Sequence, residues 1–537
     1  ETNRTESQWI PMGPFDYTLT GSWSAGHGRV NTVVADPNES NTIYIGAPAG
    51  GIWKSTNAGQ TWTVLNDQLG IIGVSAIAID PDNSDIIYIG TGDDDAGDTF
   101  SIGIMKSTDG GENWNTTGLV LAGNSRVSNV LIDPDNSQVI YAATNSGLFK
   151  SENGGTSFSV ILSVNIRDLS FKPGDSQTIY AVDSDFFYRS TNSGTSFDQI
   201  SSGLPTSDVS RIVIGVSPAQ PQYVYLLIAD NSSGFKGMYR SMNSGSSFSL
   251  RNNTTDIFES SQAWYDLAIA VDPVNADIVY TGVLNLWKST NGGSGFTQIN
   301  SWSNPTGASY THADIHFLGF LGTSLFCGSD GGVYKSTNGA NNFTDLSIGL
   351  QIGQFYKIDG TEQNENAIVG GLQDNGGYYT QSGQGGWKNY FGADGMDCVI
   401  DPSNHDVIYG SIQFGSIYQS TDGGETSFGI GSPENGAWVT PIQIDPGDHA
   451  RLLGGYSQLY EYESGSWNPL TSFDFGGDLN NIKIAPSNSD IIYLSRGSSL
   501  YKTINGGGSV AQLDGLPSGS ITGIDIHDTN PNMVWVT

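Results

Sequence analysis

Short apolar runs recur along the whole chain and alternate with polar turns. Many runs end in Asp-Pro, as at Asp36-Pro37 and Asp133-Pro134, and Asp-Pro followed by a small polar residue is typical of a turn. A second run then ends in an aromatic residue, as at Ile87-Tyr88. Short runs rich in Val, Ile and Tyr predict β-strands, and no segment has a helical period. The pattern indicates an all-β protein.

One turn sequence returns after these strands, and its clearest copy is Ser107-x-Asp109-x-Gly111-x-x-Trp114. A short Asp or Asn side chain can accept hydrogen bonds from the backbone amides that follow it and so close a tight turn. The glycine tolerates a positive φ, and the aromatic residue anchors the next strand. The copies begin at Ser55, Ser107, Ser151, Ser190, Ser241, Ser289, Ser336, Ser420 and Thr503.

The spacing of these copies predicts the fold. Neighbouring copies up to Ser336 lie 39 to 52 residues apart, and the two later gaps are about twice as long. Thr380 to Trp387 and Tyr460 to Trp467 fit as degenerate copies in those gaps. A repeat of this length with four antiparallel strands is the layout of a β-propeller blade. The fold class that we expect is therefore all-β, with tandem β-propellers and four-stranded blades.

The number of repeats predicts two rings. First strands start near residues 29, 74, 126, 166, 209, 266, 312, 353, 396, 440, 479 and 520. Propellers usually have four to eight blades, so twelve repeats suggest a first propeller of about seven blades over residues 1–350. Residues 351–537 would form a second propeller that is incomplete at its C-terminal end. We expect Trp9 to Phe15 to be an outer strand that completes a blade.

Composition excludes some functions. The formal net charge is −33, from 21 Lys and Arg against 54 Asp and Glu, which argues against nucleic acid, because its affinity comes from basic contacts to phosphate. No run is apolar enough to predict membrane insertion, and no signal peptide is evident. The two cysteines, Cys327 and Cys398, have no metal-ligand spacing, and the sequence leaves open whether they pair.

The repeated turn resembles the Asp-box, or BNR repeat, of sialidases, sortilin-type domains and tandem-propeller xyloglucan hydrolases. The stretch from Gly28-Arg-Val-Asn31 through Asp36-Pro37 to Ser55 is also similar to secreted bacterial BNR proteins. Many of those proteins come from Bacteroidetes and are exported by the type IX secretion system. The resemblance implies a secreted or cell-surface protein whose partner is a polysaccharide, a cell-surface protein or the secretion machinery.

Thr311-His312-Ala-Asp314-Ile-His316 is the first candidate site. Residues two apart on a strand share a face, so we expect His312, Asp314 and His316 to point the same way. Imidazole and carboxylate groups on one face could hold a transition metal. The alternatives are a polar lining of the propeller channel and a contact with a ligand or substrate, and the sequence does not decide among the three.

A second candidate region runs from Gly370 to Gln413. Its amides, on Gln373, Asn375 and Gln413, suit sugar hydroxyls, although tight turns at a blade rim would explain the same residues. Exposed aromatic rings could stack on sugars, and Trp387 and Tyr390 are the ligand-binding candidates among them. A glycosidase needs two carboxylates beside the scissile bond. The catalytic candidates are Asp394, Asp374, Asp397 and Asp314.

The stretch Gly92-Asp93-Asp94-Asp95-Ala-Gly-Asp98 is the candidate metal loop. Dense carboxylates with glycines can bind calcium through oxygen ligands, and a solvated acidic loop is the alternative. We therefore expect calcium as the ligand of Asp93, Asp94, Asp95 and Asp98 if that loop binds a metal. We expect no required cofactor.

Three functions are compatible with these features. The first is a recognition protein that binds a polysaccharide or a protein partner on a propeller face. The second is an endo-acting glycoside hydrolase, in which resemblance to the xyloglucan hydrolases implies paired Asp catalysis in a cleft between the propellers. The third is a structural or adhesion component. We expect the first, and paired carboxylates with aromatic subsites would favour the second.

Overall fold

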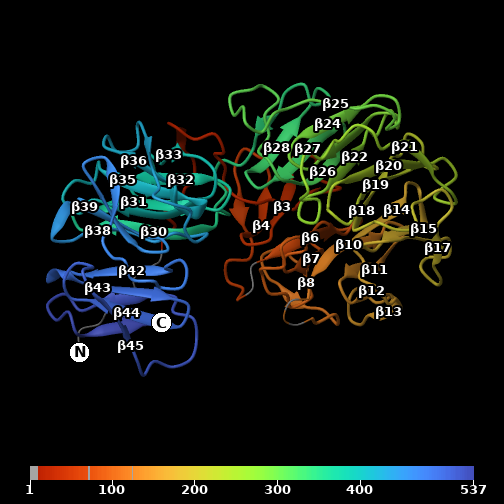
Figure 1. The fold of residues 1–537 in the computed structure, drawn as a ribbon. Coiled ribbons are helices and arrows are strands. Elements are labelled where there is room, and N and C mark those ends of the chain that lie inside the picture. The colour runs from red at the N-terminus through yellow and green to blue at the C-terminus, as the bar shows by residue number, and fades with distance from the viewer. Residues whose placement is uncertain (1–9, 71–72, 122, 124) are drawn as a thin grey trace. The chain divides into compact units, whose positions relative to one another are not determined.

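The computed structural model describes residues 10–537 except 71, 72, 122 and 124. This part of the chain is almost entirely β, with one short 3-10 helix, η1 (Gln413–Gly415). It divides into two compact units (Figure 1). The seven-blade unit is Gly26–Ile352, and the C-terminal unit combines Gly353–Thr537 with the N-terminal segment up to Ala25. The division lies close to the predicted boundary at residue 350, but residues 10–25 belong with the C-terminal unit.

Seven four-stranded antiparallel sheets make up the seven-blade unit. The first strand of each sheet contacts the first strand of the next, and the last returns to the first, which closes a ring. These first strands are β2 (Thr32–Ala35), β6 (Val74–Ile79), β10 (Val127–Asp133), β14 (Asp168–Lys172), β18 (Arg211–Val216), β22 (Ala268–Val271) and β26 (Ile315–Leu321). All seven begin within a few residues of their predicted positions.

The C-terminal unit contains four complete sheets and a two-stranded sheet in its described residues. Its first strands follow one another in space in chain order. They are β30 (Phe355–Thr361), β34 (Gly395–Ile400), β38 (Ile442–Asp445), β42 (Asn481–Ala485) and β46 (Ile524–Ile526). The segment from Trp9 to Phe15, predicted as an outer strand, is not one in its described residues. Instead β1 (Thr18–Leu19) adds a fifth, parallel strand beside β33 (Lys388–Phe391).

The repeated turn closes as the sequence predicts. In the copy after β8 (Ile104–Ser107), the Ser107 hydroxyl donates to Asp109 at 2.8 Å and accepts the Gly111 N–H at 2.9 Å. Asp109 also accepts the Asn113 N–H at 2.9 Å. Gly111 has a φ of +98°, and a Cβ there would lie 2.5 Å from Leu65. The turn is therefore braced by its own side chains and packed against the preceding blade.

Buried tyrosines join neighbouring blades. Tyr88, on β7 (Ile87–Thr91), is fully buried, and its hydroxyl donates to the Gly154 carbonyl of the next blade's turn at 2.9 Å. Its cross-strand neighbour Lys106 lies over the ring, 5.1 Å from the centroid. Tyr44, Tyr141, Tyr180, Tyr225 and Tyr280 occupy the equivalent strand of other blades and are also buried. The Ile-Tyr pattern thus marks the contact between blades.

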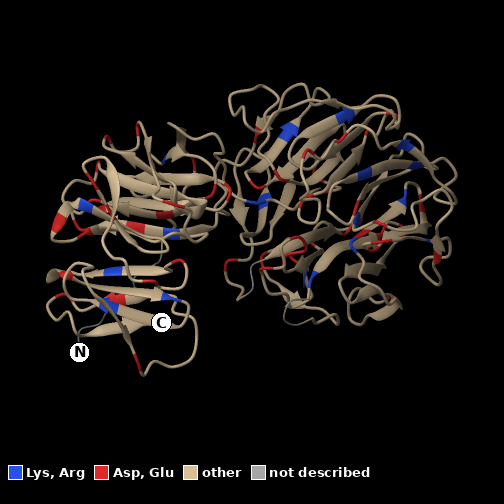
Figure 2. Cartoon of the chain, in the orientation of Figure 1, with Lys and Arg blue, Asp and Glu red and all other residues tan. Residues whose placement is uncertain are grey.

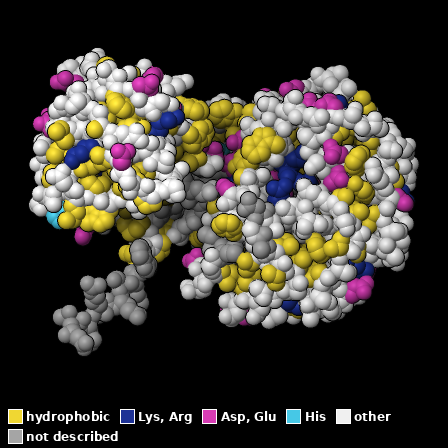
Figure 3. Space-filling view, turned by 60° about the horizontal axis from the view of Figure 1, so that its bottom comes forward, with side chains coloured by type: hydrophobic (Ala, Val, Ile, Leu, Met, Phe, Trp, Pro, Cys, Tyr) yellow, Lys and Arg dark blue, Asp and Glu magenta, His cyan; other side chains and the backbone are white. Residues whose placement is uncertain are grey.

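Acidic residues are scattered over the loops of both units, and Lys and Arg are fewer (Figure 2). On the face seen in Figure 3, most of the surface is uncharged, and apolar side chains form separate patches. No helix in the described residues is long or apolar enough to cross a membrane. Cys327 and Cys398 are both buried free thiols.

Candidate functional site

The acidic loop after β7 is held by arginines from other blades. Asp93 binds Arg29 at 2.7 Å, and Asp95 binds Arg211 at 2.8 Å. Asp94 lies 3.4 Å from Arg126, and Asp98 is 3.8 Å from Arg29. No three metal-ligating side chains from this loop lie within ligand distance of one another among the described residues. In this loop, for which the sequence leaves calcium binding and a solvated acidic loop open, the carboxylates pair with arginines.

Charged side chains also line a cavity of about 240 Å³ in the seven-blade unit. Asp94, Asp95, Arg167, Arg211 and His316 all face it. Burial raises the pKa of Asp93 to about 6, although the Arg29 guanidinium lowers it. The Arg29–Asp93 and Arg211–Asp95 pairs are buried, so removing one partner of either would leave a buried charge uncompensated. These pairs link residues of different blades.

His316 lies at the centre of the cluster. Its Nδ1 is 2.8 Å from Asp95, and its Nε2 is 3.0 Å from Asp330, while the side chain is fully buried. Burial alone would lower the pKa of His316, but the two carboxylates raise it to about 10. Tyr265 donates its hydroxyl to Asp330 at 2.8 Å and packs edge-on against the His316 ring. His316 is therefore a buried cation bridging two anions.

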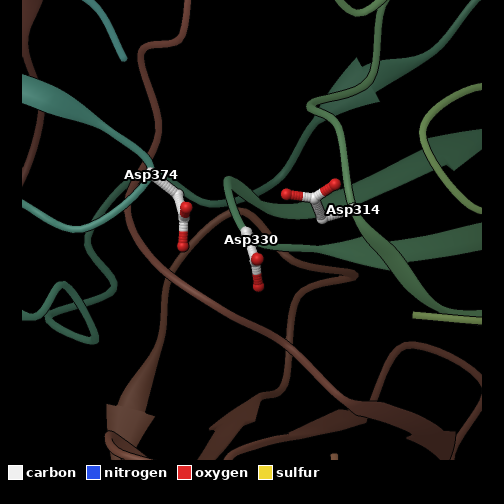
Figure 4. A group of neighbouring side chains, drawn as sticks. All are labelled: Asp314, Asp330 and Asp374. Atoms are coloured by element: carbon white, nitrogen blue, oxygen red, sulfur yellow. The ribbon is translucent and has the colours of Figure 1, made fainter. Parts of the chain in front are cut away.

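Asp314 and Asp330 form a close carboxyl pair beside this histidine (Figure 4). Their nearest oxygens lie within 4.8 Å. Asp314 directly precedes β26, and Asp330 directly follows β27 (Ser324–Ser329), the strand that pairs with β26. Asp374, drawn in the same figure, belongs to the C-terminal unit.

The pKa values of these two carboxyl groups shift in opposite directions. Burial and the Asp330 charge raise the pKa of Asp314 to about 6, while His312 and His316 lower it. Burial also acts on Asp330, but His316 and Arg29 hold its pKa below the usual range. Opposite shifts in neighbouring carboxyls separate an acid from a base. Below pH 6, Asp314 is therefore mostly protonated while Asp330 stays ionised.

Further groups hold Asp314 in place. Gln262 donates its amide to Asp314 and, at 3.3 Å, to Asp266. Asp266 is buried, and burial raises its pKa well above the usual range, with the Asp314 charge as the next cause. Asp314 has a φ of +60°, a region that costs a non-glycine residue free energy and is often found at functional sites.

The predicted common face of His312, Asp314 and His316 is wrong. Alternation holds only within a regular strand, and β26 starts after Asp314, with a register shift between Ile315 and Phe317. His312 is buried against Gly331, where an added Cβ would lie 2.4 Å from it, and its Nδ1 is 3.2 Å from the Ala313 carbonyl. Of the three side chains, His316 is the one that pairs with both Asp95 and Asp330.

In the C-terminal unit, Asp374 and Asp394 come together. The Asp374 N–H donates to the Asp394 carboxylate at 2.9 Å, and both residues are half-buried. Asp374 follows β31 (Asn364–Leu372) with a φ of +63°. Its neighbour Asn375 is buried, with its amide bound to the Gln373 carbonyl at 2.7 Å. The Gln373 side chain accepts the Tyr356 hydroxyl of β30 at 3.2 Å.

Asp397 and Gln413 have different surroundings. Asp397 accepts the Ile442 N–H of the next blade at 3.0 Å, and burial raises its pKa to about 6. Asp359 makes the same contact to Ile400, so Asp397 is part of a repeated brace between blades. Gln413, in η1, keeps a buried Oε1 with no hydrogen-bond partner among the described residues.

Trp387 and Tyr390 are not exposed rings, contrary to prediction. Trp387 is 2% exposed and donates its indole N–H to the Met12 carbonyl at 3.0 Å. Tyr390, on β33, is fully buried and packs edge-on against Phe391. Trp387 ends a degenerate copy of the repeated turn, where the aromatic residue anchors the blade, and Tyr390 lies on the strand that follows it. They cannot stack on a ligand.

Sequence reasoning missed Asp330, Asp266 and the arginines of the cluster. Asp330 had a signal, because Ser329-Asp330-Gly331-Gly332 stands between the second and third strands of its blade, as Asp374-Asn375-Gly376-Gly377 does in another. The arginines had no comparable signal that would place them together. Arg29, Arg126 and Arg211 come from separate blades, and only the closed ring brings them to one place.

No family model matches the chain. It is 29% identical over 169 residues to a xyloglucanase of Paenibacillus, which is 28% of this chain and 16% of that protein. It is 30% identical over 152 residues to xyloglucanase Xgh74A of Acetivibrio thermocellus, which is 26% of this chain and 18% of that protein. The matched segments thus span less than a fifth of these relatives.

Solved structures show the same fold at low identity. An ancestral GH74 enzyme matches with a TM-score of 0.66 and 17% identity, over 95% of this chain and 78% of its own. The GH74 xyloglucanase of Xanthomonas campestris has a TM-score of 0.51 and 15% identity, over 92% and 94% of the two chains. PorZ, a surface component of the type IX secretion system of Porphyromonas gingivalis, has a TM-score of 0.51 and 13% identity, over 89% and 65%.

These comparisons confirm the tandem-propeller fold. They also overturn the first predicted function, a recognition protein without catalysis, because the sequence relatives are xyloglucanases. The second predicted function, a glycoside hydrolase, agrees better with them.

Proposed function

We propose that this chain belongs to a glycoside hydrolase that cleaves a β-glucan such as xyloglucan, with Asp314 as proton donor. The observation that carries the proposal is the close Asp314–Asp330 pair, whose pKa values shift in opposite directions. The sequence similarity to xyloglucanases supports the choice of substrate.

The chemistry requires a carboxylic acid that protonates the leaving glycosidic oxygen. Such an acid works best when its pKa is near the working pH, and the pKa of Asp314 is about 6. Asp330 is 1% exposed and bound to Tyr265 and His316, so it does not reach a substrate. Its ionised charge keeps Asp314 protonated, which makes Asp330 a positioning residue.

A second, ionised carboxylate must act as base or nucleophile. Asp374 and Asp394, both half-buried in the C-terminal unit, are the remaining candidates from the sequence, and separate Asn variants test each. Asp397 is no longer a good candidate for this role, because its carboxylate accepts the backbone N–H of Ile442 in the next blade.

We further propose that the reaction takes place outside the cell, where polymeric β-glucans are found. Export through a type IX pathway and membership of the BNR proteins rest on the sequence resemblance. Export is tested directly by locating the full-length protein, inside or outside the cell, in its own organism.

The pH dependence of hydrolysis tests the assignment of Asp314. Because the acid must be protonated, kcat on xyloglucan should fall as pH rises above about 6. Asp314→Asn should lose at least about 100-fold in kcat, a typical share for acid catalysis. A parent enzyme with a flat profile between pH 5 and 8, or an Asp314→Asn variant with parental kcat, would contradict the assignment.

A further inference from the structure

Two exposed aromatic rings stand together on the loops of the C-terminal unit. Phe414 is 46% exposed and Trp438 is 45% exposed. Their ring centroids lie 5.3 Å apart at an interplanar angle of 84°. Large apolar side chains that stay exposed in one place often mark a binding surface.

Hydrogen bonds hold the backbone at both residues and the indole ring of Trp438. The Phe414 N–H donates to the Trp438 carbonyl at 3.3 Å, and the Gly436 N–H donates to the Phe414 carbonyl at 2.9 Å. The Trp438 indole N–H donates to the Tyr356 hydroxyl at 3.1 Å. A ring that is already fixed loses little entropy when a ligand stacks on it.

Phe414 also has a strained backbone. Its φ is +63°, which is unusual for a bulky side chain. The next residue, Gly415, accepts the Tyr456 hydroxyl at 2.6 Å, and a Cβ on Gly415 would lie 2.7 Å from the Tyr456 ring. The surrounding loop therefore fixes the conformation that keeps the phenyl ring exposed, and strain of this kind tends to persist where function needs it.

An open polar pocket adjoins this platform. Its volume is about 520 Å³, and it is lined by Ala437, Asp478, Asn480, Arg496 and residues 497–499. Ala437 directly precedes Trp438, so the pocket begins beside the aromatic pair. Asn480 accepts the Gly497 N–H at 2.8 Å through its Oδ1, which orients its amide group. The pocket offers carboxylate, amide and guanidinium groups to a ligand.

We propose that Phe414 and Trp438, with the pocket of Asp478, Asn480 and Arg496, form a subsite for a neutral sugar unit of a glucan. The flat apolar face of a pyranose stacks on an aromatic ring, and paired hydroxyls suit the polar groups beside it. A single charged ligand is disfavoured, because both signs of charge line the pocket. The identity of the polymer rests on the proposed function, whereas the sugar subsite follows from the loops themselves.

Isothermal titration calorimetry with a xyloglucan heptasaccharide and with cellotriose tests the subsite. Trp438→Ala should weaken the binding of at least one of them about tenfold. Arg496→Ala should also weaken sugar binding. Because Arg496 is an exposed residue of the pocket, this variant should keep its fold. Trp535→Ala is the matched control, because Trp535 is 51% exposed on β47 (Val534–Val536), packs against His527 and does not line the pocket.

The outcomes separate the two proposals. Parental affinity in both Trp438→Ala and Arg496→Ala, or no measurable binding by the parent, would overturn the subsite. Equal losses in Trp438→Ala and Trp535→Ala would do the same. Absence of hydrolysis by a parent that still binds sugar in a Trp438-dependent way would overturn the hydrolase proposal and leave the subsite in place.

Discussion

Neutralising Asp95 should destabilise the seven-blade unit more than any single surface change. The Asp95 carboxylate accepts hydrogen bonds from Arg211 at 2.8 Å, His316 at 2.8 Å and Asn31 at 2.9 Å. Asn at this position offers one acceptor oxygen and turns an amide N–H₂ toward a donor. Breaking a buried ion pair from one side costs about 3–5 kcal/mol.

The expected shift in melting temperature follows from the size of the unit. About 330 residues in Gly26–Ile352 give an unfolding entropy near 0.7 kcal/mol/K, at about 2.1 cal/mol/K per residue. A loss of about 3–5 kcal/mol then lowers the melting temperature of this unit by about 4–7 °C. Differential scanning calorimetry at pH 7 measures this shift.

The control is Asp67→Asn, which removes the same charge from an exposed position in the same unit. It should move the melting temperature by no more than about 1 °C, since exposed substitutions change stability little. If Asp95→Asn has the same melting temperature as the Asp67→Asn control, the ion cluster does not stabilise the unit and the reasoning is refuted.

Three further predictions follow from the same structure. The pKa of His316 is raised to about 10, so its stabilising contribution is full below pH 6.5 and is lost as pH rises through 10. His316→Gln should therefore flatten the dependence of the melting temperature on pH over that range. An unchanged profile in the variant would show that His316 does not cause the pH dependence. Ser107→Ala removes the hydrogen bonds to Asp109 and Gly111 and should cost about 1 kcal/mol in urea unfolding, a result that an unchanged midpoint would refute. Because arginines pair the carboxylates of the Asp93 loop, dialysis against EDTA should leave the melting temperature unchanged, and a drop restored by calcium would show a metal site.

The fold could be predicted from the sequence because its information is local. Each repeated turn is closed by side chains within a few residues of one another, as Ser107 and Asp109 show. The alternating strands and the buried tyrosine on the second strand are also read within one repeat. The starts of twelve first strands were therefore predicted to within a few residues.

The site could not be predicted in the same way, because its contacts cross the ring. Asp95 meets His316 across 221 positions of sequence and Arg211 across 116. The prediction for His312 failed since strand alternation does not extend past the left-handed Asp314. Trp387 and Tyr390 were placed on the surface because composition does not separate an aromatic blade anchor from an exposed ring.

The release of reducing ends from xyloglucan at pH 5.5 is the measurement that tests the account most directly. The parent chain should release oligosaccharides steadily, and Asp314→Asn should lose this activity while keeping the parental melting profile. A folded parent chain that releases nothing from xyloglucan or from unbranched β-glucans would contradict the proposed hydrolase function.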